Sequence, residues 1–362
     1  MTPEQLGHAP AGAAARAAVR AVRASLSGMS EPAVTRAKVG VRDVAALAGV
    51  SSQTVSRVLN DHPHIRDETR RRVLEAMAAL GYRVNNAARS LGTATTRTLG
   101  VIASDATLYG PAVGIAALET AARTAGRWIA TAYADAADAA SVSAAAEHLL
   151  SQGVDGIVVV APHARTLETL AGLELPVAEL HGGPGAARQG EGAGSAVHHL
   201  VDLGHTRIAH LTGPAEWREA AARDAGVRAA LAAAGLEPGP RWEGDWSADA
   251  GAHRAAEIAA AVRAPGGPTA VVVANDQMAL GLMAGLADLG LAVPGDVSVA
   301  GFDDNPDAAY YRPALTTVRL DIEGEARRCI GEVLGLQAAD APALTPAPPT
   351  LVARASTGPP RS

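Results

Sequence analysis

The sequence predicts an α/β chain in which a small all-helical headpiece precedes a two-lobed core of parallel sheets flanked by helices. Two observations carry this expectation. Residues 41–80 hold three short helical patterns, with a glycine turn between the first two and a proline break before the third. From residue 99 onward, short apolar runs alternate with amphipathic helical stretches, as they do in doubly wound parallel sheets.

The length and composition fit a globular protein of two or three domains. The chain has 362 residues, of which 48% are hydrophobic and 19% are charged. No segment approaches the ~20 apolar residues that a membrane span needs. The single cysteine, Cys329, excludes a disulfide framework and is expected to fill the core of a protein in a reducing cytoplasm.

Charge is divided unevenly along the chain. The net charge is -6, yet residues 38–92 carry nine Lys and Arg against five Asp and Glu, a balance of +4. The 270 residues that follow carry 18 against 30, a balance of -12. Such asymmetry indicates a nucleic-acid-binding module fused to an acidic one. The acidic part does not weaken DNA binding if it faces away, because phosphate attraction is local.

Residues 1–37 are rich in Ala, Arg, Gly and Pro and contain only two acidic residues. They can be read as a transit peptide, as a disordered extension, or as the result of a start codon assigned too early, with Met29 as the true start. We favour the last two interpretations over a transit peptide and assign the segment no function.

The three headpiece helices have clear sequence boundaries. The first covers 41–48 and ends at Gly49, and the second covers 51–60 with a serine N-cap. After the break at 61–64, Asp67 can cap a third helix that runs to Leu80 and ends at Gly81. Short helices joined by a tight glycine turn form a helix-turn-helix unit.

A small polar linker at 93–98 leads into the core. Its expected strands are the apolar runs 99–103, 128–132, 156–161, 176–180, 207–211, 270–274 and 297–301. Seven strands over about 220 residues indicate two sheets and hence two lobes. Ligands bind beyond the carboxyl ends of such strands, so the residues that follow each run matter most.

The start of the second helix has the residues that a DNA-reading helix needs. Ser51, Ser52, Gln53 and Thr54 are small or polar enough to approach base edges and phosphates. Gln53 can pair with adenine, and Arg57 can reach guanine or phosphate. The same pattern also describes an ordinary surface helix, so these residues alone leave both interpretations open.

A longer set of fixed positions decides between them. The stretch 41–60 (VRDVAALAGVSSQTVSRVLN), continued by Thr69-Arg70, Ala79, Gly81-Tyr82, Asn85, Ala88-Arg89 and Leu91, resembles the headpiece of the lactose/galactose repressor (LacI/GalR) family of transcriptional regulators. The match spans about 55 residues.

The resemblance implies roles for the headpiece residues. It implies that Ser52, Gln53 and Arg57 read bases, and that phosphates are held by Ser51, Thr54, Asn60 and His64. The repressor after which the family is named has tyrosine where Ser52 stands, so a different operator is expected.

Residues 85–91 resemble the family's hinge helix, in which Asn85, Ala88 and Leu91 would contact DNA. Leu91 would act as an apolar wedge in the minor groove, although it can also be the last turn of a packed helix. Val84 stands where most relatives have proline, which leaves the start of the hinge less rigid.

The resemblance continues to about residue 360 through Gly213-Pro214, 244–248 (GDWSA), 274–281 (ANDQMALG), 301–304 (GFDD) and Leu315-Thr316-Thr317. It implies a core similar to periplasmic sugar-binding proteins. The resulting domains are an extension (1–37), a headpiece (38–84), a hinge and linker (85–97), an effector-binding and dimerisation core (98–356) and a tail (357–362).

By this resemblance a small sugar binds between the lobes. Asn275, Arg223 and Asp303 would hydrogen-bond its hydroxyls with help from Ser104, and Trp246 would cover a ring face. The expected apolar wall is Leu108 and Ile322, and Glu191 stands at the position of a pocket aspartate. Structural alternatives stay open: Arg223 can be a surface helix residue, and Trp246 can fill the interface between the lobes. The neighbouring Asp276 is expected to cap the helix that follows its strand. A galactoside, another small glycoside or a degenerate pocket all remain open.

The segment after Leu336 is proline-rich and lacks the leucine heptad by which the family's namesake forms tetramers. We therefore expect a homodimer whose two-fold axis matches a pseudo-palindromic site in double-stranded operator DNA.

We find no Gly-x-Ser-x-Gly elbow, P-loop or paired metal-ligand spacing in the sequence, so no catalytic residue, metal or cofactor is expected. A sugar-transport protein would explain the core but not the helix-turn-helix. The sequence therefore predicts a cytoplasmic, nucleoid-associated regulator, most simply a repressor of sugar-catabolism genes, with no membrane association. A regulator that responds to a non-sugar ligand is the alternative.

Overall fold

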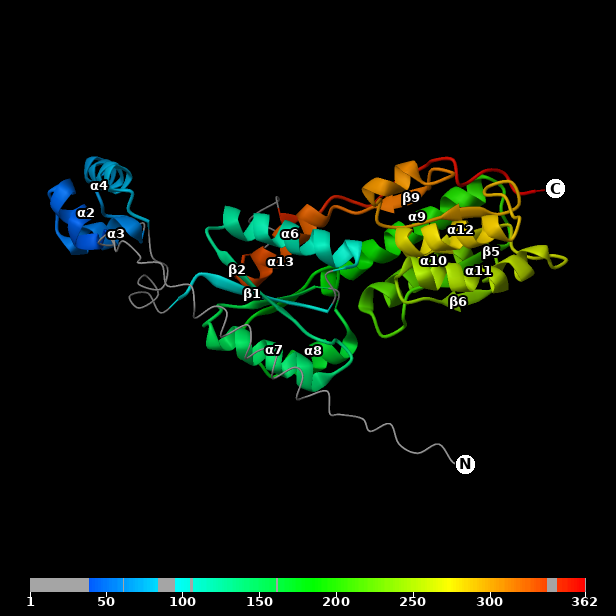
Figure 1. The fold of residues 1–362 in the computed structure, drawn as a ribbon, viewed down its shortest axis with the longest axis horizontal. Coiled ribbons are helices and arrows are strands. Elements are labelled where there is room, and N and C mark those ends of the chain that lie inside the picture. Colours follow the sequence, from blue (N-terminus) through cyan, green and yellow to red (C-terminus); the bar gives the residue numbers. More distant parts are fainter. Residues whose placement is uncertain are drawn as a thin grey trace, which may run out of the picture. The chain divides into compact units, whose positions relative to one another are not determined.

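The computed structural model describes residues 39–60, 62–83, 95–104, 107–160, 162–336 and 344–361. Its contacts divide the chain into two units, residues 1–85 and 86–362 (Figure 1). The expected hinge at 85–91 and the first two residues of the linker, 93 and 94, lie outside the described residues, as does the N-terminal extension.

The first unit is the helical headpiece. It consists of α2 (Val41–Ala48), α3 (Ser52–Leu59) and α4 (Asp67–Leu80), packed around a small core that includes Val44, Val55 and Val73. Gly49 and Gly81 adopt left-handed conformations at the ends of α2 and α4, which confirms both expected glycine stops.

The start of the third headpiece helix differs in one detail from the sequence prediction. Arg66, not Asp67, is the N-cap of α4, and it makes no side-chain cap bond. Asp67 and Glu68 occupy the first turn instead, where a negative charge complements the exposed amides.

The first lobe of the core is a parallel sheet of order β2-β1-β3-β4, made of β1 (Thr98–Ala103), β2 (Trp128–Tyr133), β3 (Ile157–Val160) and β4 (Val177–Glu179). α6 (Tyr109–Thr124) and α13 (Ile322–Val333) cover one face, and α7 (Ala139–Ser151) and α8 (Ala164–Leu170) cover the other. Alternate residues of β3 pack against the helices on opposite faces of the sheet. Both faces are buried, so the strand is a continuous apolar run.

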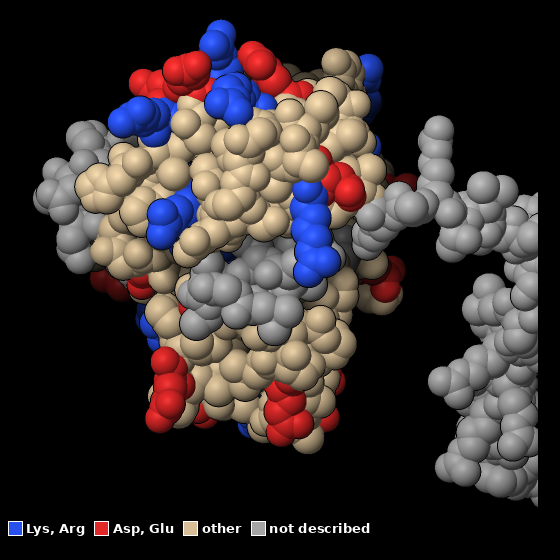
Figure 2. Space-filling model, turned by 90° about the vertical axis from the view of Figure 1, so that its left-hand side faces the viewer, with Lys and Arg blue, Asp and Glu red and all other residues tan. Residues whose placement is uncertain are grey.

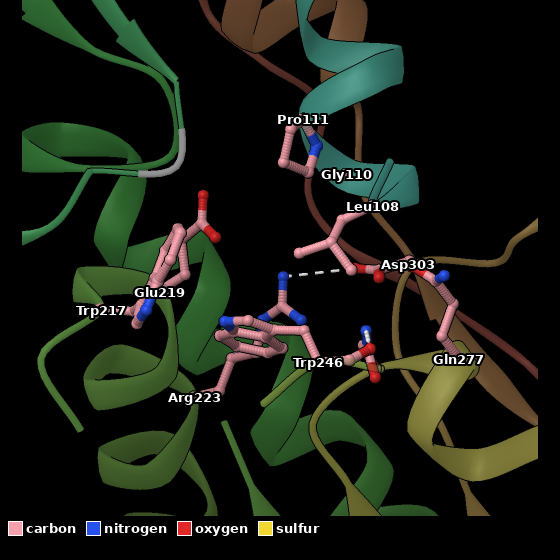
Figure 3. Close-up of a pocket in the computed structure, with 10 residues that line it drawn as sticks. Leu108, Gly110, Pro111, Trp217, Glu219, Arg223, Trp246, Gln277 and Asp303 are labelled. Carbon is pink, nitrogen blue, oxygen red and sulfur yellow. Dashed lines mark hydrogen bonds and ion pairs between the residues drawn. The ribbon is translucent and has the colours of Figure 1, made fainter. Parts of the chain in front are cut away.

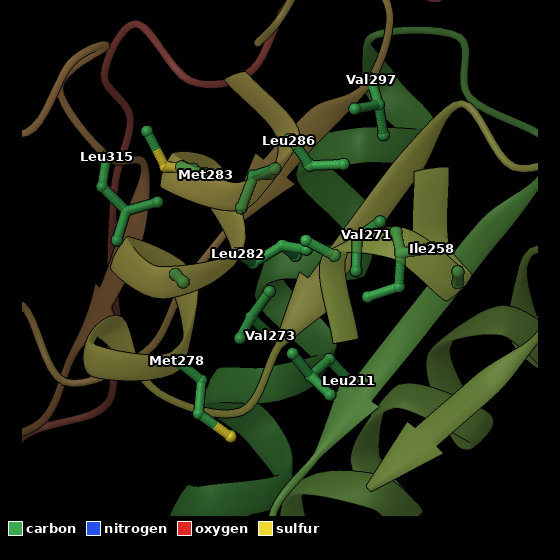
Figure 4. Close-up of a cluster of buried hydrophobic side chains, with 14 of the residues drawn as sticks. Leu211, Ile258, Val271, Val273, Met278, Leu282, Met283, Leu286, Val297 and Leu315 are labelled. Carbon is green, nitrogen blue, oxygen red and sulfur yellow. The ribbon is translucent and has the colours of Figure 1, made fainter. Parts of the chain in front are cut away.

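The second lobe repeats this plan with the order β6-β5-β7-β8. Its strands are β5 (Ile208–Thr212), β6 (Arg241–Glu243), β7 (Ala270–Val273) and β8 (Ser298–Ala300). On one face, α11 (Ala248–Arg263) and α12 (Asp276–Asp288) bury the core drawn in Figure 4, which includes Leu211, Val273 and Leu282. The other face packs against α9 (Ala186–Asp202) and α10 (Arg218–Ala233).

The chain passes between the lobes at three places. It leaves β4 through the short 3-10 helix η1 (Gly183–Gly185) into α9, and it returns from β9 (Thr317–Arg319) into α13. It then crosses again to β10 (Thr350–Val352), which pairs antiparallel with β9. η2 (Pro306–Tyr310) lies before β9.

All seven expected strands are present, and no boundary is shifted by more than one residue. Three further strands, β6, β9 and β10, were not predicted from the sequence. Each has three residues, and β6 is partly exposed, so neither a long apolar run nor a clean alternation marks it.

The C-terminal segment is also more closely attached than expected. Thr357 and Gly358 hydrogen-bond to Thr316, His205 and Ser298, so the expected boundary at 356/357 does not separate the core from a loose tail. Cys329 is fully buried as expected, and burial raises the pKa of its thiol to about 12. Among the described helices none is long and apolar enough to cross a membrane.

Candidate functional site

The N-terminus of α3 is organised by its own hydroxyl groups. The Ser51 Oγ accepts a hydrogen bond from the Thr54 backbone N–H at 3.1 Å and lies 2.9 Å from the Thr54 Oγ1. This N-cap fixes the first turn of α3 and leaves the remaining amides of that turn open to an anion. The structure thus supplies an exposed helix N-terminus where the DNA-reading residues are expected.

The expected DNA-reading side chains lie on the outside of the headpiece. Ser52, Gln53, Arg57 and His64 are exposed, whereas Val55 and Val58 on the opposite face of α3 are buried. Asn60 and Thr54 are half-buried. The turn before α3 is held by Arg72, which donates through Nη2 to the Ala48 and Gly49 carbonyls and so ties α4 to the end of α2. The roles of these residues on DNA stay predictions.

On the face that Figure 2 shows, charge alone does not mark a DNA-binding surface. In the view of Figure 2, basic and acidic side chains are interspersed, with wide uncharged areas between them. The case for a DNA interface therefore rests on the helix geometry and on the polar first turn of α3. The three expected hinge contacts, Asn85, Ala88 and Leu91, lie outside the described residues.

In the core, an inner pocket lies between the two lobes (Figure 3). Leu108, Gly110 and Pro111 line it from the first lobe, and the second lobe contributes Trp217, Glu219, Arg223, Trp246, Asn275, Gln277 and Asp303. The pocket lies where four helices begin, because Leu108, Trp217 and Asn275 are the N-caps of α6, α10 and α12, and Trp246 precedes the N-cap of α11. This is the carboxyl edge of both sheets, where doubly wound folds bind ligands.

Arg223 is the centre of the inner pocket. Its Nε donates to the Gln189 Oε1 at 2.7 Å, its Nη1 donates to the Ala274 carbonyl at 2.5 Å, and its Nη2 lies 3.2 Å from the Asp303 Oδ1. The guanidinium also lies 3.9 Å from the centroid of the Phe302 ring and 5.6 Å from that of Trp246. It is 5% exposed, so Arg223 is not the surface helix residue that the sequence left open.

Asn275 joins two parts of the site. Its Oδ1 accepts from the Met278 N–H and caps α12, while its Nδ2 donates to the Trp246 carbonyl at 2.9 Å. Trp246 has a positive φ of 78°, and its ring lies over Gly213, where a Cβ would be 2.3 Å from the indole. A side chain at residue 213 would displace Trp246, so the glycine is needed by this packing.

Asp276 does not have the capping role that the sequence suggested. The cap of α12 is Asn275, whereas the Asp276 carboxylate accepts from the Thr317 hydroxyl at 2.6 Å and from the Asn305 N–H at 2.8 Å. It therefore holds the loop after β8, which carries Asp303, against β9.

Burial shifts the protonation of the acids around Arg223. It raises the pKa of Asp303 to about 6, although the Arg223 charge opposes the shift. Burial likewise raises the pKa of Glu219 to about 7, with Arg223 again opposing and Asp303 adding to the shift. Burial lowers the pKa of His181 to about 3, helped by Arg223 and Arg328, so this imidazole stays neutral. The inner pocket thus offers one guanidinium, two amides and two carboxyls in a low-polarity setting.

The structure brings together most, not all, of the expected effector residues. Leu108, Arg223, Trp246, Asn275 and Asp303 line the inner pocket. Ser104 lies just outside it, in the cleft that Leu108 and Trp246 also border, and its buried Oγ has no hydrogen-bond partner among the described residues.

Two expectations are corrected. Glu191 is exposed on α9, and Gln189 on the same helix is the residue that contacts Arg223. A helix turns by ~100° per residue, so a shift of two positions moves a side chain from the buried face to solvent. Ile322 begins α13, packs against the core of the first lobe and does not line the inner pocket.

Sequence reasoning missed Trp217, Glu219 and Gln277. Trp217 is the N-cap of the helix that carries Glu219 and Arg223, and the positions i and i+4 share a helix face. Applying this rule backward from Arg223 would have selected Glu219. No comparable signal marks Gln277, whose Oε1 accepts from the Tyr109 N–H at 3.1 Å across the two lobes. Among the described residues, no group of His, Cys, Asp and Glu is arranged to hold a metal ion.

Comparisons with known proteins agree with both units. A model of the bacterial regulatory proteins of the lacI family matches residues 41–85, and a periplasmic binding protein-like domain matches residues 197–357. The chain is 35% identical over 307 residues to the lactose operon repressor of Escherichia coli (strain K12), covering 82% of this chain and 84% of that protein. It is 33% identical over 297 residues to the transcriptional repressor PurR of Vibrio campbellii (strain ATCC BAA-1116), covering 77% and 86%.

The fold is also similar to that of solved repressor structures. The crystal structure of the lac repressor dimer bound to operator and the anti-inducer ONPF superposes with a TM-score of 0.69 at 31% identity, covering 88% of this chain and 99% of that one. The helix-turn-helix headpiece, the two-lobed core and these similarities have one explanation: the chain belongs to the LacI family and is a DNA-binding transcriptional repressor with a ligand-binding core.

Proposed function

We propose that this repressor is controlled by a small sugar bound between the lobes of its core, with a galactoside as the first candidate. The observation that supports the proposal most is the Arg223–Asp303 pair, which lies beside Trp246 in a pocket at the carboxyl edge of both sheets. Sugar hydroxyls need paired donors and acceptors, and a sugar ring has an apolar face that suits an indole. PurR is nearly as similar to the chain as the lactose operon repressor, so sequence identity alone does not select the ligand.

The mechanism follows from the position of the pocket. Its walls come from both lobes, so a ligand that contacts both changes the free energy of their relative orientation. Such a change is transmitted to the headpiece through residues 85–97 and weakens operator binding. The coupling expected for systems of this kind is about 1–3 kcal/mol.

We also propose that the repressor acts as a homodimer on a pseudo-palindromic operator, because two identical headpieces require two related half-sites. The segment after Leu336 lacks a leucine heptad. Light scattering on the full chain should therefore give the mass of a dimer, and a stable tetramer would contradict this part of the proposal.

The deciding experiment is a titration of the full chain against its own upstream DNA, followed by fluorescence anisotropy at moderate salt. Specific binding relative to a scrambled sequence of equal length, released by one sugar of a panel that includes galactosides, is the expected result. Specific binding that no sugar changes would contradict the sugar effector and leave the DNA function in place. The absence of specific binding would contradict the choice of operator or the DNA function itself.

A further inference from the structure

The charged groups that line the inner pocket are not all paired. All three nitrogens of the Arg223 guanidinium have partners within the protein, and the negative one among these partners is Asp303. Glu219, the second carboxyl group of the pocket, accepts no hydrogen bond and forms no ion pair with any described residue. In Figure 3 its carboxyl group points into the pocket, and no dashed line joins it to a neighbour. Because the Arg223 charge is already paired with Asp303, an ionised Glu219 gives the pocket a net negative charge.

Two indole rings line the pocket together with this carboxyl group. Trp217 and Trp246 meet edge to face, with 6.3 Å between the ring centroids. The other lobe fixes the position of Trp217, which forms an antiparallel bridge with His163 and packs edge-on against its ring at 6.1 Å. The faces of aromatic rings carry a negative potential and attract cations, most strongly those of tryptophan. The indoles and the unpaired carboxyl group therefore favour the same kind of ligand group, a positively charged one.

The removal of Glu219 from water makes a counter-charge valuable. Burial is the main cause of its raised pKa of about 7, and the charge of Arg223 does not cancel this effect. A neutral ligand leaves the carboxyl group either protonated or ionised without a close counter-charge. An ammonium group allows it to ionise and pairs with it where little water screens the attraction, so the interaction is stronger than in bulk water.

The inner pocket has room for a group of this size. Its free volume is about 30 Å³, and a buried water needs ~10–15 Å³ on the same measure, so an ammonium group fits, whereas a sugar ring requires the pocket to widen. A cleft of about 830 Å³ adjoins the inner pocket and shares Leu108, Trp217 and Trp246 with it, so the two spaces are continuous. We call this second space the outer cleft. A ligand can therefore reach Glu219 from solvent through the outer cleft.

We propose that Glu219 is a specificity-determining residue that selects a positively charged effector, namely an amino sugar. The ammonium group of the sugar pairs with the Glu219 carboxylate beside the two indole rings, and its hydroxyls reach the Arg223–Asp303 pair. A neutral sugar of the same shape forgoes the ion pair, so the charge of the ligand contributes a large part of the selectivity. This inference deepens the proposed sugar effector and rests on it.

The test is isothermal titration calorimetry on the full chain with amino sugars and their neutral counterparts. Galactosamine is compared with galactose, glucosamine with glucose, and each amino sugar with its N-acetyl derivative, which lacks the positive charge. The 6-amino-6-deoxy forms of galactose and glucose place the amine at another carbon of the ring. At least one amino sugar should bind about tenfold more tightly than its neutral counterparts, the range expected for one charged hydrogen bond.

Two variants assign the preference to one carboxyl group. Glu219→Gln has the shape of the protonated side chain, so it should fold, as tryptophan fluorescence can check, and it should abolish most of the preference for the amine. The matched control is Glu216→Gln, which removes an exposed carboxyl group that lines the outer cleft but not the inner pocket. Solvent screens this charge, so the control should keep the preference.

Proton release on binding gives a readout that a loss of packing would not change. At about pH 6 Glu219 is mostly protonated, because its pKa in the folded protein is about 7, so pairing with an ammonium group should release about one proton. The release is measured from the dependence of the binding enthalpy on the ionisation enthalpy of the buffer. Asp303, with a pKa raised to about 6, can also exchange a proton, so the contribution of Glu219 is the difference between the wild type and Glu219→Gln.

Equal affinity for amino sugars and their neutral counterparts would overturn the role of Glu219 and leave a sugar effector intact. A preference for the amine that survives in Glu219→Gln would overturn it in the same way. If no sugar binds, with or without an amine, the sugar effector itself is contradicted, so the two failures are distinguishable.

Discussion

The headpiece and the core place their functional side chains in opposite settings. In the headpiece, residues 51–54 are consecutive, lie at the start of one helix and are largely exposed. In the core, Arg223 is buried and meets Gln189, Ala274 and Asp303, which come from three other segments of the chain. A surface that reads DNA can be built from one helix, whereas a pocket between lobes needs the whole fold to assemble it.

The two settings also differ in how the site is stabilised. Ser51 and Thr54 need only a local cap, and the headpiece core beneath them is small. Around Arg223 a charge is removed from water, and its cost is offset by three polar partners and two aromatic rings. Mutations should therefore have local and modest effects in the headpiece, and large ones at the centre of the core.

The largest effect is expected for Arg223→Ala. The variant leaves the Asp303 carboxyl buried without its counter-charge, which should lower the free energy of unfolding of the core by about 3–5 kcal/mol. All four tryptophans lie in the core, so denaturant titration followed by tryptophan fluorescence reports on this unit alone. The sugar response should be lost while operator affinity is kept.

The control for this variant is Arg228→Ala on the same helix. Arg228 pairs with Asp224 at 3.1 Å, but its side chain is 62% exposed, so its loss should change the stability by less than about 1 kcal/mol. Equal losses in the two variants, or a normal sugar response in Arg223→Ala, would show that Arg223 is not the centre of the site.

A smaller effect should appear in the pH dependence of the core's free energy of unfolding. The pKa of Glu219 in the folded protein is raised to about 7, so between its ordinary value and pH 7 the folded state binds more protons than the unfolded state. The resulting stability is fully present at low pH and is lost as the pH rises through 7. Between pH 5.5 and pH 8 the free energy of unfolding should fall in the wild type. In Glu219→Gln this fall should be smaller by about 1–2 kcal/mol.

Thermal unfolding at the two pH values, followed by tryptophan fluorescence, measures this difference. Glu216→Gln changes an exposed neighbour just before the same helix and should keep the pH dependence of the wild type. An identical pH dependence in Glu219→Gln and the wild type would mean that Glu219 is not responsible. The pKa of Asp303 is also raised, to about 6, so a smaller pH dependence of the stability should remain in Glu219→Gln at lower pH.

The smallest effect is expected in the headpiece. Ser51→Ala removes the N-cap of α3 and should destabilise the headpiece by about 1 kcal/mol, with a matching loss of operator affinity and no change in the tryptophan signal of the core. Ser56→Ala, at an exposed position of the same helix, should stay within about 0.5 kcal/mol of the wild type. Far-UV circular dichroism and operator titration check both. A change in the stability of the core in Ser51→Ala would show that the headpiece and the core do not unfold independently.

Particular residues show how far sequence reasoning reached. The glycine stops at Gly49 and Gly81 and the cap at Ser51 were predicted because each depends on neighbours within one helical turn. The expected pocket residues Arg223, Trp246, Asn275 and Asp303 do line one pocket, and they were found through family resemblance and not through periodicity. Glu191 was misplaced because its distance along the chain did not reveal which face of α9 turns inward.

The sequence by itself therefore determined the three headpiece helices, seven of the ten strands in the described residues, the separation of a basic headpiece from an acidic core, and the residues at the start of α3. These features depend on local periodicity, capping and composition, which act over a few residues. Only the tertiary structure decided that Gln189 and not Glu191 meets Arg223, that Trp217 bridges the two lobes, and that a large cleft adjoins a small inner pocket. Those features arise from contacts between distant segments, and no local pattern in a single chain specifies which of them will touch.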